Sequence, residues 1–552
     1  MSSTNPLFFD SNTQFSLDLR SFFPSIQWSK WDYAWKRVLE SIDNIESGKI
    51  VNQTSVKEES ENRCVDHYNL RHHKEIVPQK SLQKSIAYWK EIQVKIGKIT
   101  SGEAKNEFGD EYTDVVFNGI GGSFLGPLMM IVFMHGDSYN FNSGLGVRIH
   151  FLSNSDADTL SALLAKINVK TSILINMSKS GSTAETKGNM DAFNANLKQQ
   201  KLDIGHHNIA ITTPGSNFDK FAQENKYMHI FYMNNETGGR TSVGSAIGAV
   251  PAAVAGIDFE AFLRGQSAMD ELTRRRDPQQ NPAMLMAAAI QTLTLKEGRK
   301  NMIVLGYSDY LKEFAHYLQQ LYMESIGKEY DVNGTPNPEG LTVFGGVGTG
   351  EQHAFMQQVQ KGFPDCFVRF VHFQKRGSDV SLSGPGSMGR QLLAFVKGTE
   401  QALQDNGKSF MTCTFEKRDM FNLGMMIALE ERIVTILAAL RNLNAYDQPG
   451  VQDGKLAATE VNKISNTIEG VLEQKLSDKN WKFEGTAEQA RTSFILPKDS
   501  NLRYVEAILN DIVSNVDVPH AYPKLHKRLS ASKSFKEEEF HFTLRSEINS
   551  KL

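Results

Sequence analysis

Short apolar runs that alternate with helical segments constrain the fold of this chain more than any other feature of its sequence. The alternation begins near residue 113 and restarts after a helical connector at about residues 259–297. Strands that alternate with helices are typical of βαβ units, in which a parallel sheet carries helices on both faces. The sequence therefore predicts an α/β protein with two doubly wound parallel sheets. The predicted strands are 114–118, 147–152, 171–176, 208–212 and 228–232 in the first sheet and 301–305, 341–344, 367–373 and 409–415 in the second.

This pattern divides the chain into four predicted parts. Residues 1–112 form a helical N-terminal segment that packs on the core, and residues 477–552 form a C-terminal extension. Between them, residues 113–290 and 291–476 are the two α/β domains. The second domain ends in a predicted helix over 455–476 that carries one apolar stripe. Within the extension, we expect a short strand at 493–496 and a helix at 502–513.

Charge and cysteine content exclude several classes of function. Lys and Arg number 60 against 63 Asp and Glu, so the net charge of −3 gives no electrostatic footprint for nucleic acid or an anionic membrane. The longest apolar run, residues 246–257, is too short to span a bilayer. The start of the chain lacks the features of a signal peptide. Three widely separated cysteines offer neither a disulfide framework nor a zinc spacing, so we expect a cytoplasmic protein. The irregular spacing of Cys64, His67, His72 and His73 likewise predicts no metal site.

Polar loops follow two strands of the first predicted domain, and open α/β sheets bind ligands at the carboxyl ends of their strands. The loop at residues 118–127 places Gly121, Gly122 and Ser123 where backbone N–H groups can close on an anion. The loop at residues 178–186 suits a phosphate monoester, because hydroxyls and helix N-terminal amides can satisfy its oxygens together. An alternative is that Ser182 or Thr183 only caps the next helix, and both interpretations can hold at once. The candidate phosphate ligands in this loop are Ser178, Lys179, Ser180, Ser182 and Thr183.

Four more titratable residues lie next to glycines or at predicted helix ends. Arg240 follows Gly238-Gly239 and could stabilise an oxyanion, although a lone Arg is more often solvated or ion-paired. Glu324 ends a predicted helix over 310–325, and Gln320 lies one turn before it, so a general base with a neighbouring amide is possible there. His353 follows a glycine-rich loop and could transfer a proton near neutral pH. Lys455 follows the turn Pro449-Gly450 and is predicted to open a helix, where an anionic ligand would account for it better than stability does. The alternative is a solvated surface lysine.

Together these motifs resemble the glucose-6-phosphate isomerase family, in which two sugar-isomerase domains are joined. Seven landmarks occur in the family's order, the first beginning with Asn62-Arg63 and the last running from Asp447-Gln448 to Gly454-Lys455. The others are Gly119-Ile120-Gly121-Gly122-Ser123, the loop 178–186, Gly238-Gly239-Arg240, Met323-Glu324-Ser325 with Gly327-Lys328, and Gln352-His353-Ala354-Phe355. The resemblance implies reversible isomerisation of D-glucose 6-phosphate and D-fructose 6-phosphate through a cis-enediol(ate), a step of glycolysis and gluconeogenesis. It implies neither a metal nor an organic cofactor.

The resemblance also assigns roles to the candidate residues. Glu324 shuttles the proton, Arg240 stabilises the enediolate, and His353 and Lys455 assist ring opening. Gln320 orients the substrate, Gly121, Gly122 and Ser123 line the sugar site, and the loop from Ser178 to Thr183 holds the phosphate. The family works as a homodimer in which the catalytic histidine comes from the neighbouring subunit. The tail lysines Lys524 and Lys527 are a weaker alternative to Lys455.

Two other functions remain open from the sequence. The family's commonest phosphate loop is Ser-Lys-Thr-Phe-Thr-Thr, whereas this chain has Ser180-Gly181-Ser182-Thr183 in the middle of the loop. This difference leaves room for an enzyme that also isomerises mannose 6-phosphate. A non-catalytic regulator that binds sugar phosphates is the second alternative, but it would not need Glu324, Arg240, His353 and Lys455 together.

Overall fold

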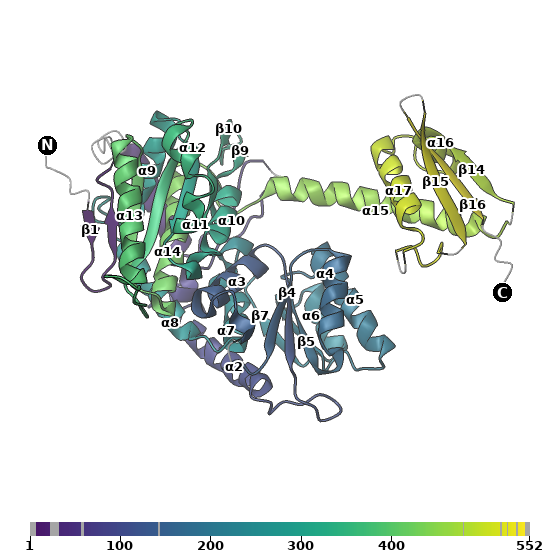
Figure 1. The fold of residues 1–552 in the computed structure, drawn as a ribbon, viewed down its shortest axis with the longest axis horizontal. Coiled ribbons are helices and arrows are strands. Elements are labelled where there is room, and N and C mark those ends of the chain that lie inside the picture. The colour runs from purple at the N-terminus through teal and green to yellow at the C-terminus, as the bar shows by residue number, and fades with distance from the viewer. Residues whose placement is uncertain are drawn as a thin grey trace. The chain divides into compact units, whose positions relative to one another are not determined.

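The computed structural model describes most of the chain in two compact units, residues 1–447 and residues 448–552 (Figure 1). The described residues are 7–21, 32–56, 60–141, 144–478, 480–518, 521–526, 528–536 and 539–546. Among them, no helix is both long and apolar enough to cross a membrane.

The first α/β domain of the larger unit contains a five-stranded sheet in which all strands are parallel. Its order is β4 (Arg148–Leu152), β3 (Asp114–Asn118), β5 (Ser172–Met177), β6 (Asn208–Thr212) and β7 (His229–Tyr232). The central strands are buried along their whole length, as expected for a sheet covered on both faces. One face packs on α4 (Ala157–Lys166), α5 (Ala184–Gln199) and α6 (Asn217–Glu224). The other packs on α2 (Leu82–Thr100), α3 (Gly122–His135) and α7 (Ala246–Val254). The doubly wound prediction is confirmed here.

The second domain contains a six-stranded sheet of order β1-β2-β13-β12-β8-β11. Four strands are parallel: β8 (Asn301–Gly306), β11 (Thr342–Val347), β12 (Cys366–Lys375) and β13 (Phe410–Lys417). The hairpin β1 (Leu7–Phe9) and β2 (Ser16–Asp18) adds to the β13 edge in antiparallel orientation. One face packs on α12 (Met356–Lys361) and α13 (Met388–Asp405), and the other on α9 (Pro282–Lys296), α10 (Phe314–Ile326) and α14 (Met420–Arg441). The N-terminal segment is therefore not purely helical, because its first strands complete this sheet.

One apolar core joins the two sheets. At its centre, α8 (Phe259–Thr273) packs along α14 through glycines. A Cβ on Gly265 would lie 1.8 Å from the carbonyl oxygen of Phe421, so only glycine permits this approach. A buried ion network crosses the same region, in which Arg71 donates to Asp270 (2.7 Å) and also pairs with Glu431. The larger unit thus holds its two sheets against one shared core.

Short elements connect the two domains and their strands. They are α1 (Asp32–Glu46), the 3₁₀ turns η3 (Asn69–Arg71), η4 (Tyr139–Phe141), η5 (Val169–Thr171), η6 (Gly239–Gly244) and η7 (Asp309–Leu311), the hairpin β9 (Lys328–Tyr330) and β10 (Pro336–Glu339), and α11 (Gly348–Gln352).

The smaller unit has an apolar core of its own. Its antiparallel sheet has the order β14 (Lys482–Gly485), β16 (Glu539–Ser546) and β15 (Leu529–Lys536), and it packs with α15 (Pro449–Lys475), α16 (Ala487–Ser493) and α17 (Leu502–Asn515).

Three sequence expectations differ from this unit as observed. Helix α15 begins at Pro449 rather than at Lys455, because Pro is well suited to the first turn of a helix. The segment predicted as a strand at 493–496 instead follows the end of α16, with Phe494 and Leu496 buried in the core. The chain divides at residue 447 rather than at 476, since Ile464, Ile468 and Leu472 of α15 belong to the C-terminal core.

Candidate active site

A carboxylate–guanidinium pair joins the two α/β domains. Glu324 lies in the last turn of α10, and its Oε2 accepts a hydrogen bond of 2.8 Å from Nη1 of Arg240 in η6. The Arg240 Nε donates to Ser325 Oγ (2.8 Å), and its Nη2 donates to the carbonyl oxygens of Ala445 (2.7 Å) and Asp447 (2.8 Å). Arg240 is only 4% exposed, whereas the Glu324 side chain is 27% exposed. The cation is therefore fixed in place, and the carboxylate beside it remains accessible.

Gln320 and the first glycine loop complete this junction. Gln320 Nε2 donates to Glu324 Oε1 (3.2 Å), so the amide and the carboxylate lie together as their helical spacing predicts. Gly121 has a φ of +58°, and a Cβ there would lie 3.0 Å from Gln320 Nε2. A Cβ on Gly122 would lie 1.8 Å from the carbonyl oxygen of Gly239. The loop after β3 thus needs its glycines in order to reach α10 and η6 together.

The hydroxyl-rich loop between β5 and α5 folds back on itself. Gly181, with a φ of +77°, donates its N–H to Ser178 Oγ (3.0 Å), and the Ser180 and Ser182 hydroxyls lie 2.6 Å apart. Thr183 is the N-cap residue of α5, but its side chain makes no capping hydrogen bond. The capping alternative is therefore wrong for Thr183. Its hydroxyl and the first-turn N–H groups of α5 offer donors to an anion at the helix N-terminus.

Lys179 adds a partly desolvated cation to this loop. Its Nζ donates to the carbonyl oxygen of Thr237 (3.3 Å), two residues before the Gly239-Arg240 pair. Burial lowers the pKa of Lys179 to about 8, and repulsion from Arg63 acts in the same direction. A phosphate dianion would stabilise the charged ammonium form here.

The topology of the first sheet brings both loops to one place. Strands β3 and β5 are neighbours, yet α3 and α5 leave them toward opposite faces of the sheet. Such a switch point opens a crevice at the carboxyl edge of a parallel sheet, where α/β proteins bind ligands. The glycine loop follows β3 and the hydroxyl loop follows β5, so both loops lie at this edge of the sheet.

His353 is not brought to Glu324. It follows α11, with its side chain exposed, and the described contacts include none between it and Glu324 or Arg240. The preceding residue, Gln352, points inward and donates to the Tyr307 hydroxyl (2.9 Å).

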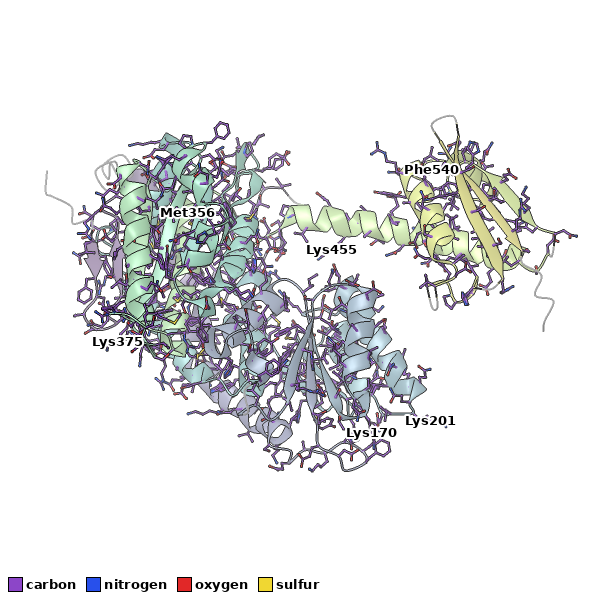
Figure 2. The ribbon with its side chains drawn as sticks, viewed as in Figure 1. Lys170, Lys201, Met356, Lys375, Lys455 and Phe540 are labelled. Atoms are coloured by element: carbon purple, nitrogen blue, oxygen red, sulfur yellow. The ribbon has the colours of Figure 1, made fainter. Side chains whose placement is uncertain are left out.

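The candidate lysines belong to the smaller unit. Lys455 lies on the second turn of α15, where Figure 2 labels it, and its side chain is exposed. Lys524 is also exposed and pairs with Glu473 (2.9 Å). Lys527 lies outside the described residues. The geometry of the larger unit leaves the roles of these lysines as predictions from sequence.

Sequence reasoning gave no role to the groups that hold Arg240. Ser325 and the two backbone carbonyls at Ala445 and Asp447 take up its Nε and Nη2 donors. A backbone carbonyl leaves no side-chain signal in a sequence. Only the nearness of these residues to the Met323-Glu324-Ser325 and Asp447-Gln448 motifs could have indicated them.

Two doubly wound domains, a hydroxyl-rich loop at a switch point and an accessible carboxylate beside a buried arginine are the features expected of a sugar isomerase with paired α/β domains. Residues 34–382 match the family model described as phosphoglucose isomerase. A glucose-6-phosphate isomerase from Prochlorococcus marinus strain NATL2A is 36% identical over 473 residues, which cover 85% of this chain and 87% of that protein. A second, from Geobacter sp. strain M21, is 33% identical and covers 93% of this chain and 94% of its own length.

A solved structure agrees with these relatives. The crystal structure of a glucose-6-phosphate isomerase from Chlamydia trachomatis superposes with a TM-score of 0.71 at 25% identity, and the match covers 82% of this chain and 88% of that chain. The chain belongs to the phosphoglucose isomerase family.

Proposed function

We propose that Glu324 transfers the proton in the interconversion of D-glucose 6-phosphate and D-fructose 6-phosphate that this chain catalyses. The observation that carries the proposal is the Glu324–Arg240 pair with Gln320 beside it (2.8 and 3.2 Å). Moving a proton between C2 and C1 requires a base at carbon and a cation for the enediolate oxygen. The accessible carboxylate beside the fixed guanidinium supplies both.

The remaining residues bind and orient the sugar phosphate. The loop from Ser178 to Thr183, with the N-terminus of α5, holds the phosphate. The loop at Gly121, Gly122 and Ser123 lines the sugar site, and Gln320 orients the substrate toward Glu324. His353 and Lys455 assist ring opening, a role that rests on their family motifs. A purely binding protein would not need this set, and the relatives are isomerases.

The working unit is a homodimer in the cytoplasm in which His353 serves the neighbouring site. Its exposed position supports this assignment, because the larger unit provides no contact from His353 to its own Glu324 among the described residues. A groove of about 260 Å³ lies beside it, between α13 and the segment from Gln352 to Gln360; Figure 2 labels Met356 in its lining. Nearby on α13, Met388, Leu393 and Phe395 are exposed at 44–56%. A second copy of the chain would cover such apolar side chains.

Activity is tested by supplying fructose 6-phosphate to the purified protein and measuring glucose 6-phosphate. We expect turnover without an added metal or organic cofactor. The same assay with mannose 6-phosphate decides whether the altered phosphate loop admits a second substrate. Sugar-phosphate binding without turnover would favour the regulator.

The dimer is tested by mixing two inactive variants, Glu324→Gln and His353→Ala, and allowing subunits to exchange. If His353 acts across the interface, each mixed dimer contains one complete site, so about a quarter of wild-type activity returns. If His353 acts within its own chain, both sites of the mixed dimer stay defective and no activity returns.

A further inference from the structure

Lys328 is a buried cation directly after the helix that carries Glu324. Its side chain is only 5% exposed, and its Nζ donates to the carbonyl oxygens of Glu324 (2.7 Å) and Asp447 (2.7 Å). The same Nζ forms an ion pair with Asp447 Oδ1 (2.8 Å). No role in the reaction described above uses this lysine.

The contact to Glu324 completes the end of α10. The last carbonyls of a helix have no partner within it, and a cation there interacts favourably with the helix dipole. Lys328 donates a hydrogen bond to the backbone carbonyl of Glu324, the residue whose side-chain carboxylate is the candidate base. Burial lowers the pKa of Lys328 and Arg240 adds repulsion, whereas the Asp447 carboxylate opposes both effects.

Asp447 connects this lysine with the other half of the candidate catalytic pair. Its carbonyl oxygen accepts hydrogen bonds from both Lys328 Nζ (2.7 Å) and Arg240 Nη2 (2.8 Å). Its second carboxylate oxygen accepts from Asn444 Nδ2 (2.7 Å). Asp447 therefore holds both cations: Arg240, which pairs with the Glu324 carboxylate, and Lys328, which donates to the Glu324 carbonyl oxygen.

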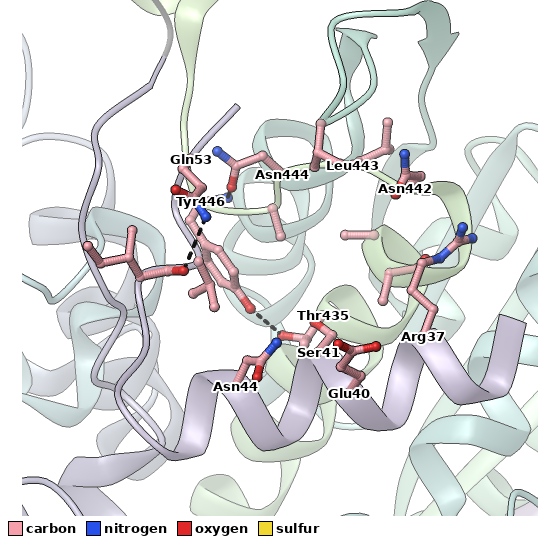
Figure 3. A pocket seen from close by; sticks show the side chains of 16 residues that line it. Arg37, Glu40, Ser41, Asn44, Gln53, Thr435, Asn442, Leu443, Asn444 and Tyr446 are labelled. Carbon is pink, nitrogen blue, oxygen red and sulfur yellow. Dashed lines mark hydrogen bonds between the residues drawn. The ribbon is translucent and has the colours of Figure 1, made fainter. Parts of the chain in front are cut away.

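The segment just before Asp447, residues 444–446, borders a cavity. The cavity has a volume of about 270 Å³. Figure 3 shows Arg37, Glu40 and Asn44 of α1 along one wall and Asn444 and Tyr446 along another. Side-chain hydrogen bonds hold the segment there: one joins the Tyr446 and Thr435 hydroxyls (3.0 Å), and Asn444 Nδ2 donates another to Asn52 Oδ1 (2.9 Å). The cavity is lined by Asn444, Ala445 and Tyr446, so these polar contacts hold the segment that leads to Asp447.

We propose that Lys328 is a positioning residue that acts with Asp447 to fix the Glu324 carboxylate relative to the Arg240 guanidinium. The inference rests on the roles proposed for Glu324 and Arg240. Proton transfer between carbons is sensitive to such placement, since a displacement of about 1 Å can cost a factor of about 100 in rate. The phosphate loop lies on other elements, so we expect loss of Lys328 to lower turnover without weakening substrate binding.

The test compares Lys328→Met with Lys312→Met, a matched control at the other end of the same helix. Lys312 is about half exposed and pairs with Asp137 on the surface. For Lys328→Met we expect kcat to fall about 10- to 100-fold while KM changes less than about threefold. The kinetic isotope effect with C2-deuterated glucose 6-phosphate should rise, because proton transfer becomes rate-limiting. Lys312→Met should leave all three quantities unchanged.

Two further variants keep the test decisive if Lys328→Met folds poorly. Asp447→Asn removes the ion pair but keeps the backbone carbonyls, and we expect a smaller loss of kcat with the same rise in isotope effect. Lys328→Arg, which retains a cation, should recover part of kcat. A merely structural role would lower the active fraction and leave the isotope effect at its wild-type value, which would overturn the proposal.

The proposal would also be overturned if the folded variants kept the wild-type isotope effect, or if KM rose by the same factor by which kcat fell. Glu324→Gln distinguishes this failure from failure of the proposed function. If Glu324→Gln abolishes turnover and Lys328→Met does not alter it, only the positioning role fails. If Glu324→Gln stays active, the assignment of the base fails with it.

Discussion

At the scale of single residues, the site is organised by how far each charge is removed from water. Arg240 is almost fully buried, and backbone carbonyls and Ser325 fix its guanidinium before any substrate arrives. A fixed cation in a poorly hydrated place stabilises developing negative charge without reorganising during the reaction. Glu324, in contrast, keeps contact with solvent and so remains accessible to a substrate.

Lys179 gives this electrostatic arrangement a measurable pH dependence. Its pKa of about 8 means that the ammonium form, the form proposed to bind phosphate, dominates below pH 8 and is lost above it. We therefore predict that kcat/KM for fructose 6-phosphate falls by up to about tenfold per pH unit above pH 8, while kcat changes little. Lys179→Arg keeps its charge, so its kcat/KM should stay level over the same range. An equally steep fall in that variant would assign the titration to another group.

Sequence reasoning selected the residues of the junction through side-chain motifs. Gln320 and Glu324 were expected together from their helical spacing, and they are hydrogen-bonded. The Lys328–Asp447 contact was not predicted, because its partners are 119 residues apart and one acceptor is a carbonyl. A hydrogen bond to a distant backbone carbonyl leaves no periodic pattern in the sequence. The functional roles of all these residues stay predictions until variants are measured.

At the scale of elements, the site is a meeting of two loops with the end of one helix. The loop after β3 touches both η6 and α10, so it links the first α/β domain with the helix that carries Glu324. The alternation of strands and helices predicted this arrangement, because switch-point loops follow from parallel topology. It could not predict the β1–β2 hairpin, whose three-residue strands are too short to show a pattern. The predicted start of α15 was six residues too late, because Pro449-Gly450 was interpreted as a turn.

Gly122→Ala tests the contact between these elements. The added methyl would lie 1.8 Å from the carbonyl oxygen of Gly239, so the backbone next to Arg240 must move. We predict a destabilisation of about 1–3 kcal/mol and a loss of most activity. Gly188→Ala on α5 is the control, since its Cβ would meet no atom within 4 Å, and it should be neutral or slightly stabilising. Thermal unfolding and the isomerase assay measure both, and a fully active Gly122→Ala variant would refute the contact.

At the scale of the whole molecule, two units with separate cores make up the chain. The relatives match most of its length, and the matched family model covers residues 34–382 of the larger unit. The smaller unit was expected only as an extension. Its short strands and its helices gave weak patterns, and its core is formed by contacts between them. The sequence nevertheless singles out Lys455 in this unit through the spacing Asp447-Gln448-x-Gly450-Val451-x-x-Gly454-Lys455.

Lys455 and Lys524 provide a matched comparison within the smaller unit. Both side chains are exposed lysines, but only Lys455 occupies the family's motif. We predict that Lys455→Ala lowers kcat at least about tenfold, equivalent to about 1.4 kcal/mol of barrier, without abolishing phosphate binding. Lys524→Ala should cost much less. The reverse ranking in steady-state kinetics would place the catalytic cation in the tail.

The most direct test of the central claim is the activity of Glu324→Gln, measured together with its affinity for a phosphorylated sugar acid that mimics the enediolate. Glutamine keeps the shape of the side chain but cannot accept a proton from carbon. We predict that turnover falls by about 10²- to 10⁴-fold and that exchange of the C1 and C2 hydrogens with solvent falls with it, while the inhibitor still binds. Retention of more than about a tenth of wild-type turnover would show that Glu324 is not the base.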